Sequence, residues 1–134
     1  MASQDHDVNV RGKLELKSTN PKDVLGIKKV PFDLIPSTAL VHQAMAHKCG
    51  AIKYGPANWR GEGVSARVYV AASLRHIFKY LEGQQFDEES GYHELGHAVA
   101  CLNIIMDAEA CGKLVDDRPP SAPLSIMLEQ WKDK

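Results

Sequence analysis

The chain has 134 residues, of which 44% are hydrophobic and 25% charged, and its formal net charge is -1. This composition is typical of one ordinary globular domain and leaves little room for a second. A net charge near zero argues against a protein dedicated to nucleic acids or membrane surfaces, although a local basic patch can still bind an anion. We therefore expect a small-molecule partner, with no nucleic acid and no membrane involved.

The three cysteines, Cys49, Cys101 and Cys111, are odd in number and have no CxxC spacing. This pattern indicates free thiols in a reducing compartment rather than a disulfide framework. The sequence also shows no signal-peptide pattern and no apolar run of about 20 residues. We expect a cytoplasmic protein.

The N-terminal part of the chain contains two kinds of segment. Residues 1–18 are polar and aperiodic, which predicts a flexible arm, and residues 19–134 are expected to form a single helical domain. The first part of that domain, residues 19–37, contains three prolines, which exclude a long helix and favour an ordered, extended lead-in. Four of its apolar side chains are expected to pack: Val30, Phe32, Leu34 and Ile35.

Two long helices follow, each with a start signal, an apolar stripe and a stop signal. The first begins at Ser37, a candidate N-cap, and ends before Gly55. Its stripe consists of Val41, Met45, Cys49 and Ile52. The second helix begins near Ser65 and ends at Gly83. Its stripe consists of Val70, Leu74, Ile77, Phe78 and Leu81.

The third long helix is predicted to be capped by Ser90 and to end at about Cys111. A turn-rich segment, residues 116–123, separates it from a short final helix with apolar residues facing inward: Leu124, Met127, Leu128 and Trp131. We predict an all-α fold, a small bundle of three main helices with an extended N-terminal arm and a short C-terminal helix. Because three helices bury little surface, we expect a homo-oligomer.

The stretch HELGH, His93 to His97, fits the H-E-x-x-H motif of zinc proteases. Two histidines one helical turn apart would bind zinc, and Glu94 would be the base. The continuation that metzincins need is absent. Glu109 cannot supply a third ligand either, because it lies about 18 Å further along the same helix. A protease is therefore the least favoured function.

Two interpretations of these histidines stay open. His93 can be a solvated residue at a helix end and His97 a core histidine without a ligand role. Alternatively, both can join His76 of the second helix and the acidic residues between the helices in a group that binds a metal ion.

Five stretches occur in one order and at natural spacing: NPKD (20–23), KYGPANW (53–59), RVYVAASLRH (67–76), DEESGYHELGHA (87–98) and DDRP (116–119). Together they resemble the phage and prophage family of dATP/dGTP diphosphohydrolase N-terminal domains, over about residues 19–119. In that family the two histidines belong to the pattern SG.H...HA and Glu94 is not held as an acid. The resemblance thus implies that the protease-like motif is incidental.

The resemblance implies hydrolysis of purine deoxynucleoside triphosphates to monophosphate and pyrophosphate with Mg²⁺ or Mn²⁺, by a phage protein in the host cytoplasm. The E-E-x-x-E and E-x-x-D metal-binding helices of other all-α nucleotide pyrophosphohydrolases are missing from this sequence. The metal ligands are therefore expected from His93, His97, Asp87 and Glu89, with Asp107 or a partner subunit as further sources. Such a mixed set suits Mn²⁺ or Zn²⁺ as well as Mg²⁺.

The catalytic residues expected are His93, His97 and Asp87, in a reaction in which water attacks phosphorus and a carboxylate or imidazole accepts the proton. A triphosphate also needs fixed cations to neutralise its charge. The candidates are Lys53, Arg60, Arg75 and Arg118. Arg75 and His76 lie away from the apolar stripe of their helix, so they can face the open part of the bundle.

The loop after the first long helix is rich in Gly and Pro, yet it carries Tyr54 and Trp59, against which a purine can stack. Asn58 offers a donor and an acceptor for a base edge. Trp59 can alternatively fill the core of a small domain. The full set of expected substrate-binding residues is Lys53, Tyr54, Asn58, Trp59, Arg60, Arg75 and His76.

Two other functions stay open. A phage protein that binds a nucleotide or cyclic nucleotide without cleaving it needs the cationic and aromatic groups but no catalytic metal, and the missing acidic motifs favour it. A structural, oligomeric helix bundle would instead use the histidines and the tryptophan loop as interface residues.

Overall fold

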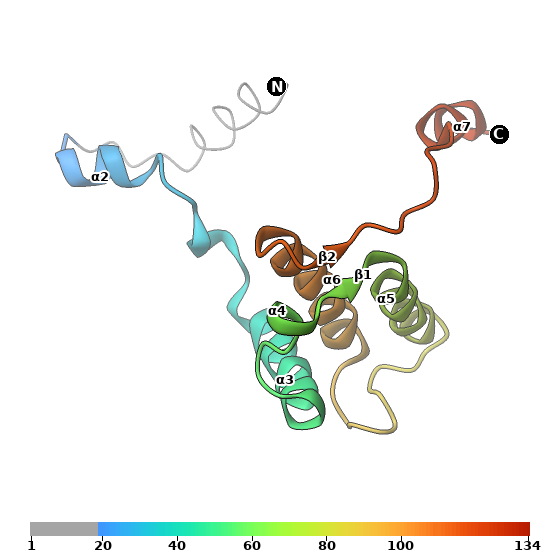
Figure 1. Ribbon diagram of the computed structural model, residues 1–134. Coiled ribbons are helices and arrows are strands. Elements are labelled where there is room, and N and C mark those ends of the chain that lie inside the picture. The colour runs from blue at the N-terminus through green and yellow to red at the C-terminus, as the bar shows by residue number, and fades with distance from the viewer. Residues whose placement is uncertain (1–18) are drawn as a thin grey trace. The chain divides into compact units, whose positions relative to one another are not determined.

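The computed structural model describes residues 19–134 of the chain (Figure 1). The flexible arm expected over residues 1–18 lies outside the described residues. The chain divides into two compact units, Met1–Ser37 and Thr38–Lys134. The single domain expected over residues 19–134 stays a prediction.

The described part of the first unit contains two short helices, α2 (Pro21–Gly26) and the 3₁₀ helix η1 (Phe32–Leu34). Asn20 caps α2, because its side chain accepts a hydrogen bond from the Lys22 amide at 2.9 Å. The absence of a long helix agrees with the three prolines. The expected packing is wrong, because helices of six and three residues bury no face, and these side chains are exposed: Val30, Phe32, Leu34 and Ile35.

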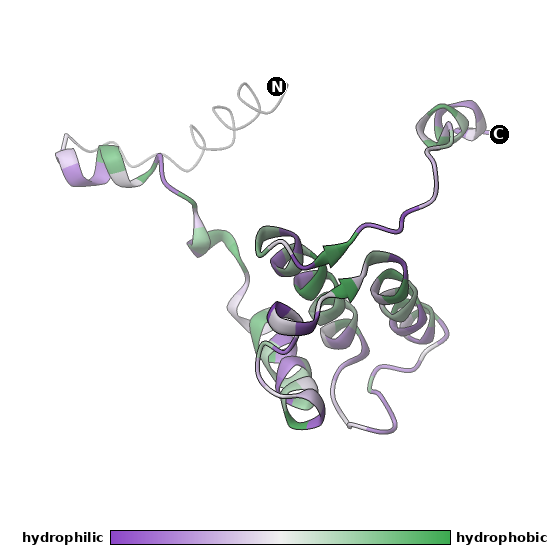
Figure 2. Cartoon of the chain, viewed as in Figure 1, coloured by the Kyte–Doolittle hydropathy of each residue, from purple (hydrophilic) through white to green (hydrophobic). Residues whose placement is uncertain are grey.

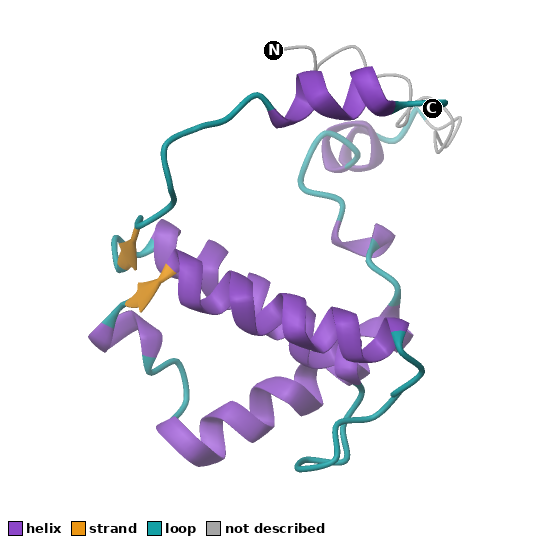
Figure 3. Ribbon diagram, turned by 90° about the vertical axis from the view of Figure 1, so that its right-hand side faces the viewer, coloured by secondary structure: helices purple, strands orange, loops and turns teal. Residues whose placement is uncertain are grey.

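The second unit is mostly helical, as predicted (Figure 3). Its helices follow in this order: α3 (Ser37–Tyr54), α4 (Trp59–Glu62), α5 (Ala66–Leu81), α6 (Glu94–Ala110) and α7 (Leu124–Trp131). The most extensive contact lies between α5 and α6. Over residues 19–134, no helix is long and apolar enough to cross a bilayer.

Two short strands, which the sequence did not predict, lie on either side of the α5–α6 pair in the chain. They are β1 (Val64–Ser65) and β2 (Leu114–Val115), and they pair in parallel, with Val64 opposite Leu114. β2 consists of two hydrophobic residues, and β1 of Val64 and the polar Ser65 (Figure 2). Two residues are too few to show the period-2 alternation by which strands are predicted. The pairing ties the start of α5 to the segment that follows α6.

The start of α5 agrees with the prediction and the start of α6 does not. Ser65 is the N-cap of α5, since its side chain accepts a hydrogen bond from the Val68 amide. The predicted cap of α6, Ser90, lies instead in a turn in which its amide donates to Asp87 at 2.8 Å. Such local side-chain turns compete with a helix start. Helix α6 therefore begins at Glu94, with His93 as its N-cap.

Small residues form the contacts between the helices. The buried hydrophobic residues in the described part of the chain are Ala46, Val64, Ala66, Ala98, Ala100 and Ala108. The backbones approach closely, because a Cβ added at Gly96 of α6 would lie 2.5 Å from the carbonyl oxygen of His42 on α3. Ser73 of α5 is buried too, and its hydroxyl donates to the carbonyl oxygen of Ala98 at 2.9 Å.

The predicted apolar stripes are largely wrong for the same reason. The side of α5 that contacts α6 carries small and polar residues, so most of the large apolar residues expected in the core lie outside it. On α3, Met45 and Cys49 are half-buried and Val41 and Ile52 are exposed. On α5, Ile77 is half-buried. The remaining stripe residues of α5 and α7 are exposed: Val70, Leu74, Phe78, Leu81, Leu124, Met127, Leu128 and Trp131.

Candidate functional site

A cavity of about 300 Å³ lies in the second unit, lined by residues of α3, α4, α5 and α6 and of the loops that follow α3 and α5. This volume is at the lower end of the range for small-molecule sites. His76 and Tyr69, seven residues apart on α5, both line it. That spacing corresponds to about 10 Å along a helix, so the cavity has two ends. We call them the imidazole–carboxylate end (His76, Asp87, His97) and the aromatic end (His47, Trp59, Tyr69).

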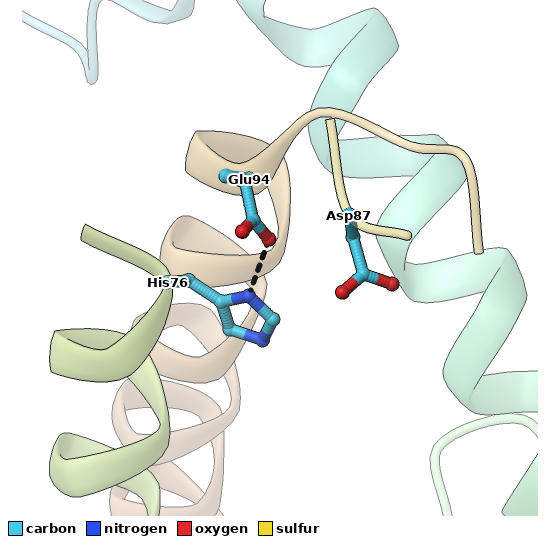
Figure 4. Close-up of side chains that lie close together, drawn as sticks. All are labelled: His76, Asp87 and Glu94. Atoms are coloured by element: carbon cyan, nitrogen blue, oxygen red, sulfur yellow. Dashed lines mark hydrogen bonds and ion pairs between the residues drawn. The ribbon is translucent and has the colours of Figure 1, made fainter. Parts of the chain in front are cut away.

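Behind the imidazole–carboxylate end lies a fully buried acid, Glu94 (Figure 4). Its Oε1 is 2.9 Å from Nδ1 of His76, and its Oε2 accepts a hydrogen bond from Gln84 at 3.1 Å. One ligand atom each of His76, Asp87 and Glu94 lies within 4.8 Å of the others, so this group could hold a metal ion. A buried carboxylate is costly without a compensating charge or hydrogen bonds.

His97 completes this end of the cavity. Its ring stacks on that of His76 with 4.9 Å between the centroids. Its Nε2 lies 2.7 Å from the hydroxyl oxygen of Ser90 and 4.0 Å from Oδ2 of Asp87. Burial, assisted by the charge of His76, lowers the pKa of His97 below 6.5, although Asp87 and Glu94 oppose the shift. The neutral ring can therefore accept the Ser90 hydroxyl proton in a hydrogen bond.

Asp87 is held as a carboxylate by its surroundings. Burial raises its pKa, but the hydrogen bonds from Ser90 and the charges of His97 and His76 outweigh that effect, and the net shift is downward. One of these bonds is the Ser90 amide donating to Oδ2 at 2.8 Å. The imidazole–carboxylate end thus combines an anionic oxygen ligand with two imidazoles.

Two rings of the aromatic end, those of Trp59 and His47, are held in place by polar side chains of α6. The indole nitrogen of Trp59 donates to Asp107 at 2.6 Å. The rings of Trp59 and His47 lie 6.0 Å apart. Asn103 donates to Nε2 of His47 at 3.2 Å, and burial lowers the pKa of His47. Burial also raises the pKa of Tyr69. This end therefore offers neutral, flat surfaces.

Lys53 is a cation in the cavity lining, and it forms an exposed ion pair with Glu89 at 3.0 Å. The hydrogen bond and the charge of Glu89 raise the pKa of Lys53. Because exposed ion pairs contribute little to stability, an anionic ligand can replace Glu89 at little cost.

A family model described as dATP/dGTP diphosphohydrolase, N-terminal, matches residues 19–118. The chain belongs to this family. The match covers well over half of the chain and confirms the resemblance seen in the sequence. No curated protein and no solved structure matches the chain.

The structure brings together three of the four residues expected to be catalytic or to bind metal in this family member. Asp87, Glu89 and His97 line the cavity, and His93 does not. The Nδ1 of His93 accepts a hydrogen bond from the Leu95 amide, so the ring is turned toward its own helix. That ring lies among three others, those of His42, Tyr80 and Phe86, at centroid distances of 4.7, 5.8 and 5.6 Å.

Five of the expected substrate-binding residues line the cavity: Lys53, Tyr54, Asn58, Trp59 and His76. Arg60 and Arg75 lie outside the lining. Arg60 is paired with Asp107, and Arg75 is exposed on α5. Arg118, a further candidate cation, is paired with Asp116.

The sequence did not identify Glu94 as a residue of the site, because the family resemblance implied that the protease-like motif is incidental. The signal for it was its place at the start of the run ELGHAVACLNII, in which Glu94 is the one acidic residue and most of the others are apolar. Such an acid is either solvated at the helix start or buried with partners. The structure shows the second arrangement, with His76 and Gln84 as the partners.

Proposed function

We propose that this protein hydrolyses purine deoxynucleoside triphosphates to the monophosphate and pyrophosphate, using a divalent metal ion. The observation that carries the proposal is the group His76, Asp87 and Glu94, located at a cavity with aromatic walls. Membership of the dATP/dGTP diphosphohydrolase family supports the substrate class. The two ends of the cavity would bind different parts of the nucleotide. The imidazole–carboxylate end, with its metal ion, would bind the phosphates, and the aromatic end would bind the base.

The side chains at the imidazole–carboxylate end fit a divalent ion. Protein ligands at about 2.2 Å from an ion lie at most about 4.4 Å apart, close to the 4.8 Å within which the ligand atoms of His76, Asp87 and Glu94 lie. One imidazole and two carboxylates form a mixed donor set, which suits Mn²⁺ or Zn²⁺ at least as well as Mg²⁺. An ion bound there would polarise phosphate oxygens and acidify a water molecule.

The other side chains of this end would orient the reactants. Nε2 of His97 is the atom that we expect to accept the proton of the attacking water, in the place that the Ser90 hydroxyl takes at 2.7 Å. Lys53 would leave Glu89 for a phosphate oxygen and would remain cationic there. Besides offering an oxygen to the ion, Glu94 would fix the ring of His76 through the bond between Oε1 and Nδ1, in the way that carboxylates orient ligand histidines.

The test is product analysis after incubation of a panel of deoxynucleoside triphosphates with the protein and Mg²⁺ or Mn²⁺. We expect monophosphate and pyrophosphate from dATP or dGTP, and loss of both products in His97→Ala and His76→Ala. Release of inorganic phosphate and a diphosphate, or no product from any triphosphate, would overturn the proposal.

Binding without cleavage is a second candidate. It is favoured by the pairing of both oxygens of Glu94, with His76 and with Gln84, which satisfies the buried acid without an ion. A protein of this kind would bind the nucleotide in the same cavity and return it intact. Saturable binding in calorimetry, with no product under any metal condition, would establish this function in place of the first.

We also propose that the protein is a homo-oligomer. The core of the described chain contains alanine and one valine as its buried hydrophobic residues, which is little for an independent fold. One face of α5 exposes large apolar side chains that a second copy can cover: Val70, Leu74, Phe78 and Leu81. Sedimentation equilibrium should give a dimer or larger species that Leu74→Glu weakens. A stable monomer at micromolar concentration would contradict this.

A phage-encoded protein in the host cytoplasm is the proposed setting. The cysteines Cys49, Cys101 and Cys111 are free thiols, which suits a reducing compartment. Fractionation of infected cells should recover the protein with cytoplasmic markers, and recovery from the periplasm would contradict the proposal.

A further inference from the structure

Asp107 of α6 is an acid that accepts hydrogen bonds from Trp59, Arg60 and, at 4.0 Å, the thiol of Cys111, and it does not line the cavity. Its Oδ2 accepts hydrogen bonds from the indole nitrogen of Trp59 at 2.6 Å and from Nε of Arg60 at 2.8 Å. Its Oδ1 accepts from Nη2 of Arg60 at 2.9 Å. These bonds, from Arg60 first and then from Trp59, lower the pKa of Asp107 to about 2. The carboxylate is therefore charged over the whole physiological range.

The element that Asp107 holds is short and has no side-chain cap. Helix α4 (Trp59–Glu62) has four residues, and the residue at its N-cap, Asn58, makes no side-chain capping bond. A helix of one turn is not stable by itself. The position of α4 on α6 thus depends on contacts such as those of Asp107, and hydrogen bonds to an ionised acceptor are among the stronger ones.

Trp59 lies in the wall of the cavity, so its orientation matters there. Stacking of a nucleobase on an aromatic side chain contributes about 1–3 kcal/mol. A ring that is already fixed loses less conformational freedom when a base binds than one that rotates. The indole N–H also has to be satisfied, and Asp107, which does not line the cavity, accepts its hydrogen bond.

We propose that Asp107 is a positioning residue, which fixes the Trp59 ring as the surface on which the nucleotide base stacks. This inference rests on the proposed function for the identity of the ligand. Asp107 touches no substrate atom, so its effect is expected in the affinity for nucleotide and not in the chemical step.

The test compares three variants in a Trp131→Phe background, which leaves Trp59 as the one tryptophan of the chain. Asp107→Ala removes the acceptor, and Asp107→Asn keeps an oxygen for the indole N–H. Asp116→Ala is the matched control, because Asp116 also binds a guanidinium through both oxygens, at 2.7 and 2.6 Å to Arg118, but no tryptophan. The measurements are KM and kcat for the best triphosphate, and acrylamide quenching of Trp59 fluorescence.

We expect Asp107→Ala to raise KM about tenfold, in line with loss of part of a stacking interaction, and to leave kcat within about twofold. Quenching by acrylamide should increase in the same variant. Asp107→Asn should restore most of the affinity, and Asp116→Ala should change neither quantity. An unchanged KM in Asp107→Ala, or a fall in kcat alone, would overturn the inference.

Failure of the proposed function is distinguishable from failure of this inference. If the parent protein cleaves no triphosphate, nucleotide binding can still be followed through Trp59 fluorescence. Saturable quenching by dATP or dGTP that Asp107→Ala weakens about tenfold would support the positioning role. No quenching by either nucleotide would overturn it.

Discussion

The two ends of the cavity are built in opposite ways. At the imidazole–carboxylate end the side chains of His76, Asp87 and His97 contact one another, and the acid that supports them, Glu94, is fully buried. At the aromatic end the rings are held from outside the cavity, Trp59 by Asp107 and His47 by Asn103. The first arrangement concentrates ionisable groups and the second presents neutral surfaces. We conclude that changes at the first end should affect turnover and those at the second should affect affinity.

The largest effect is expected for Asp87→Asn. The substitution keeps the shape of the side chain and removes the charge of a proposed metal ligand, so kcat should fall by about 100-fold or more while KM changes little. Steady-state kinetics and metal analysis of the purified variant measure both effects. Glu88→Gln is the control, because Glu88 is exposed and does not line the cavity. An equal loss of kcat in the two variants would contradict a specific role of Asp87 in turnover.

The second largest effect is expected for Glu94→Gln, which removes the charge of the buried acid at the imidazole–carboxylate end. Loss of the carboxylate should lower the affinity for Mn²⁺ by about 10- to 100-fold. The amide also places a donor opposite His76 or Gln84, and a buried mismatch of this kind destabilises by about 1–3 kcal/mol. Calorimetric Mn²⁺ titration and urea unfolding test the two parts. Wild-type values in both would mean that Glu94 has no role.

At the aromatic end, Trp59→Ala should raise KM about tenfold and change kcat little, since stacking acts on binding. Trp131→Ala is a control of the same chemistry, because Trp131 is exposed on α7. Both variants are assayed with the best triphosphate. A kcat effect as large as that of Asp87→Asn would contradict the division of the cavity.

Gly96→Ala tests the helix contact on which both ends depend. The added Cβ would lie 2.5 Å from the carbonyl oxygen of His42, so α3 and α6 must separate. We expect a loss of about 1–3 kcal/mol in the free energy of unfolding. Gly50→Ala on α3, where nothing lies within 4 Å, should instead be neutral or stabilising by up to about 1 kcal/mol. Equal unfolding midpoints for the two variants would argue against this packing.

The smallest effect is a pH dependence of stability through Asp107. Its pKa is about 2 in the folded chain against 3.8 ordinarily, so the group stabilises the fold above pH 3.8, and that contribution is lost as the pH falls toward 2. Urea unfolding of wild type and Asp107→Asn should differ at neutral pH and converge below pH 3.8. A difference that grows on acidification would contradict the sign.

Local signals in the sequence predicted a helix end correctly where the cap or stop residue interacts only with its neighbours in the sequence. Ser65 caps α5 as expected, and Gly83 lies beyond its end with a φ of 98°, which favours glycine. The start of α6 could not be predicted in this way, because Ser90, the expected cap, forms a turn with Asp87 instead. The stripes of α3 and α5 failed because periodicity identifies large apolar residues, whereas these helices approach through alanine, serine and glycine.

The sequence predicted the types of residue at the candidate site better than it predicted which of these residues contact one another. Asp87 and His97 were expected together, and both line the cavity. His93 was expected with them, but capping turned its ring toward its own helix. Glu94 depends on a contact with His76 of another helix, eighteen residues away in the sequence. No local pattern records such a tertiary contact.

The most direct test of the metal-dependent activity is product analysis of protein stripped of metal, incubated with dATP and dGTP, before and after addition of Mn²⁺. We expect no cleavage by the stripped protein, and monophosphate plus pyrophosphate once Mn²⁺ is added. Intact triphosphate with every divalent ion tried, or equal cleavage with and without metal, would contradict the account.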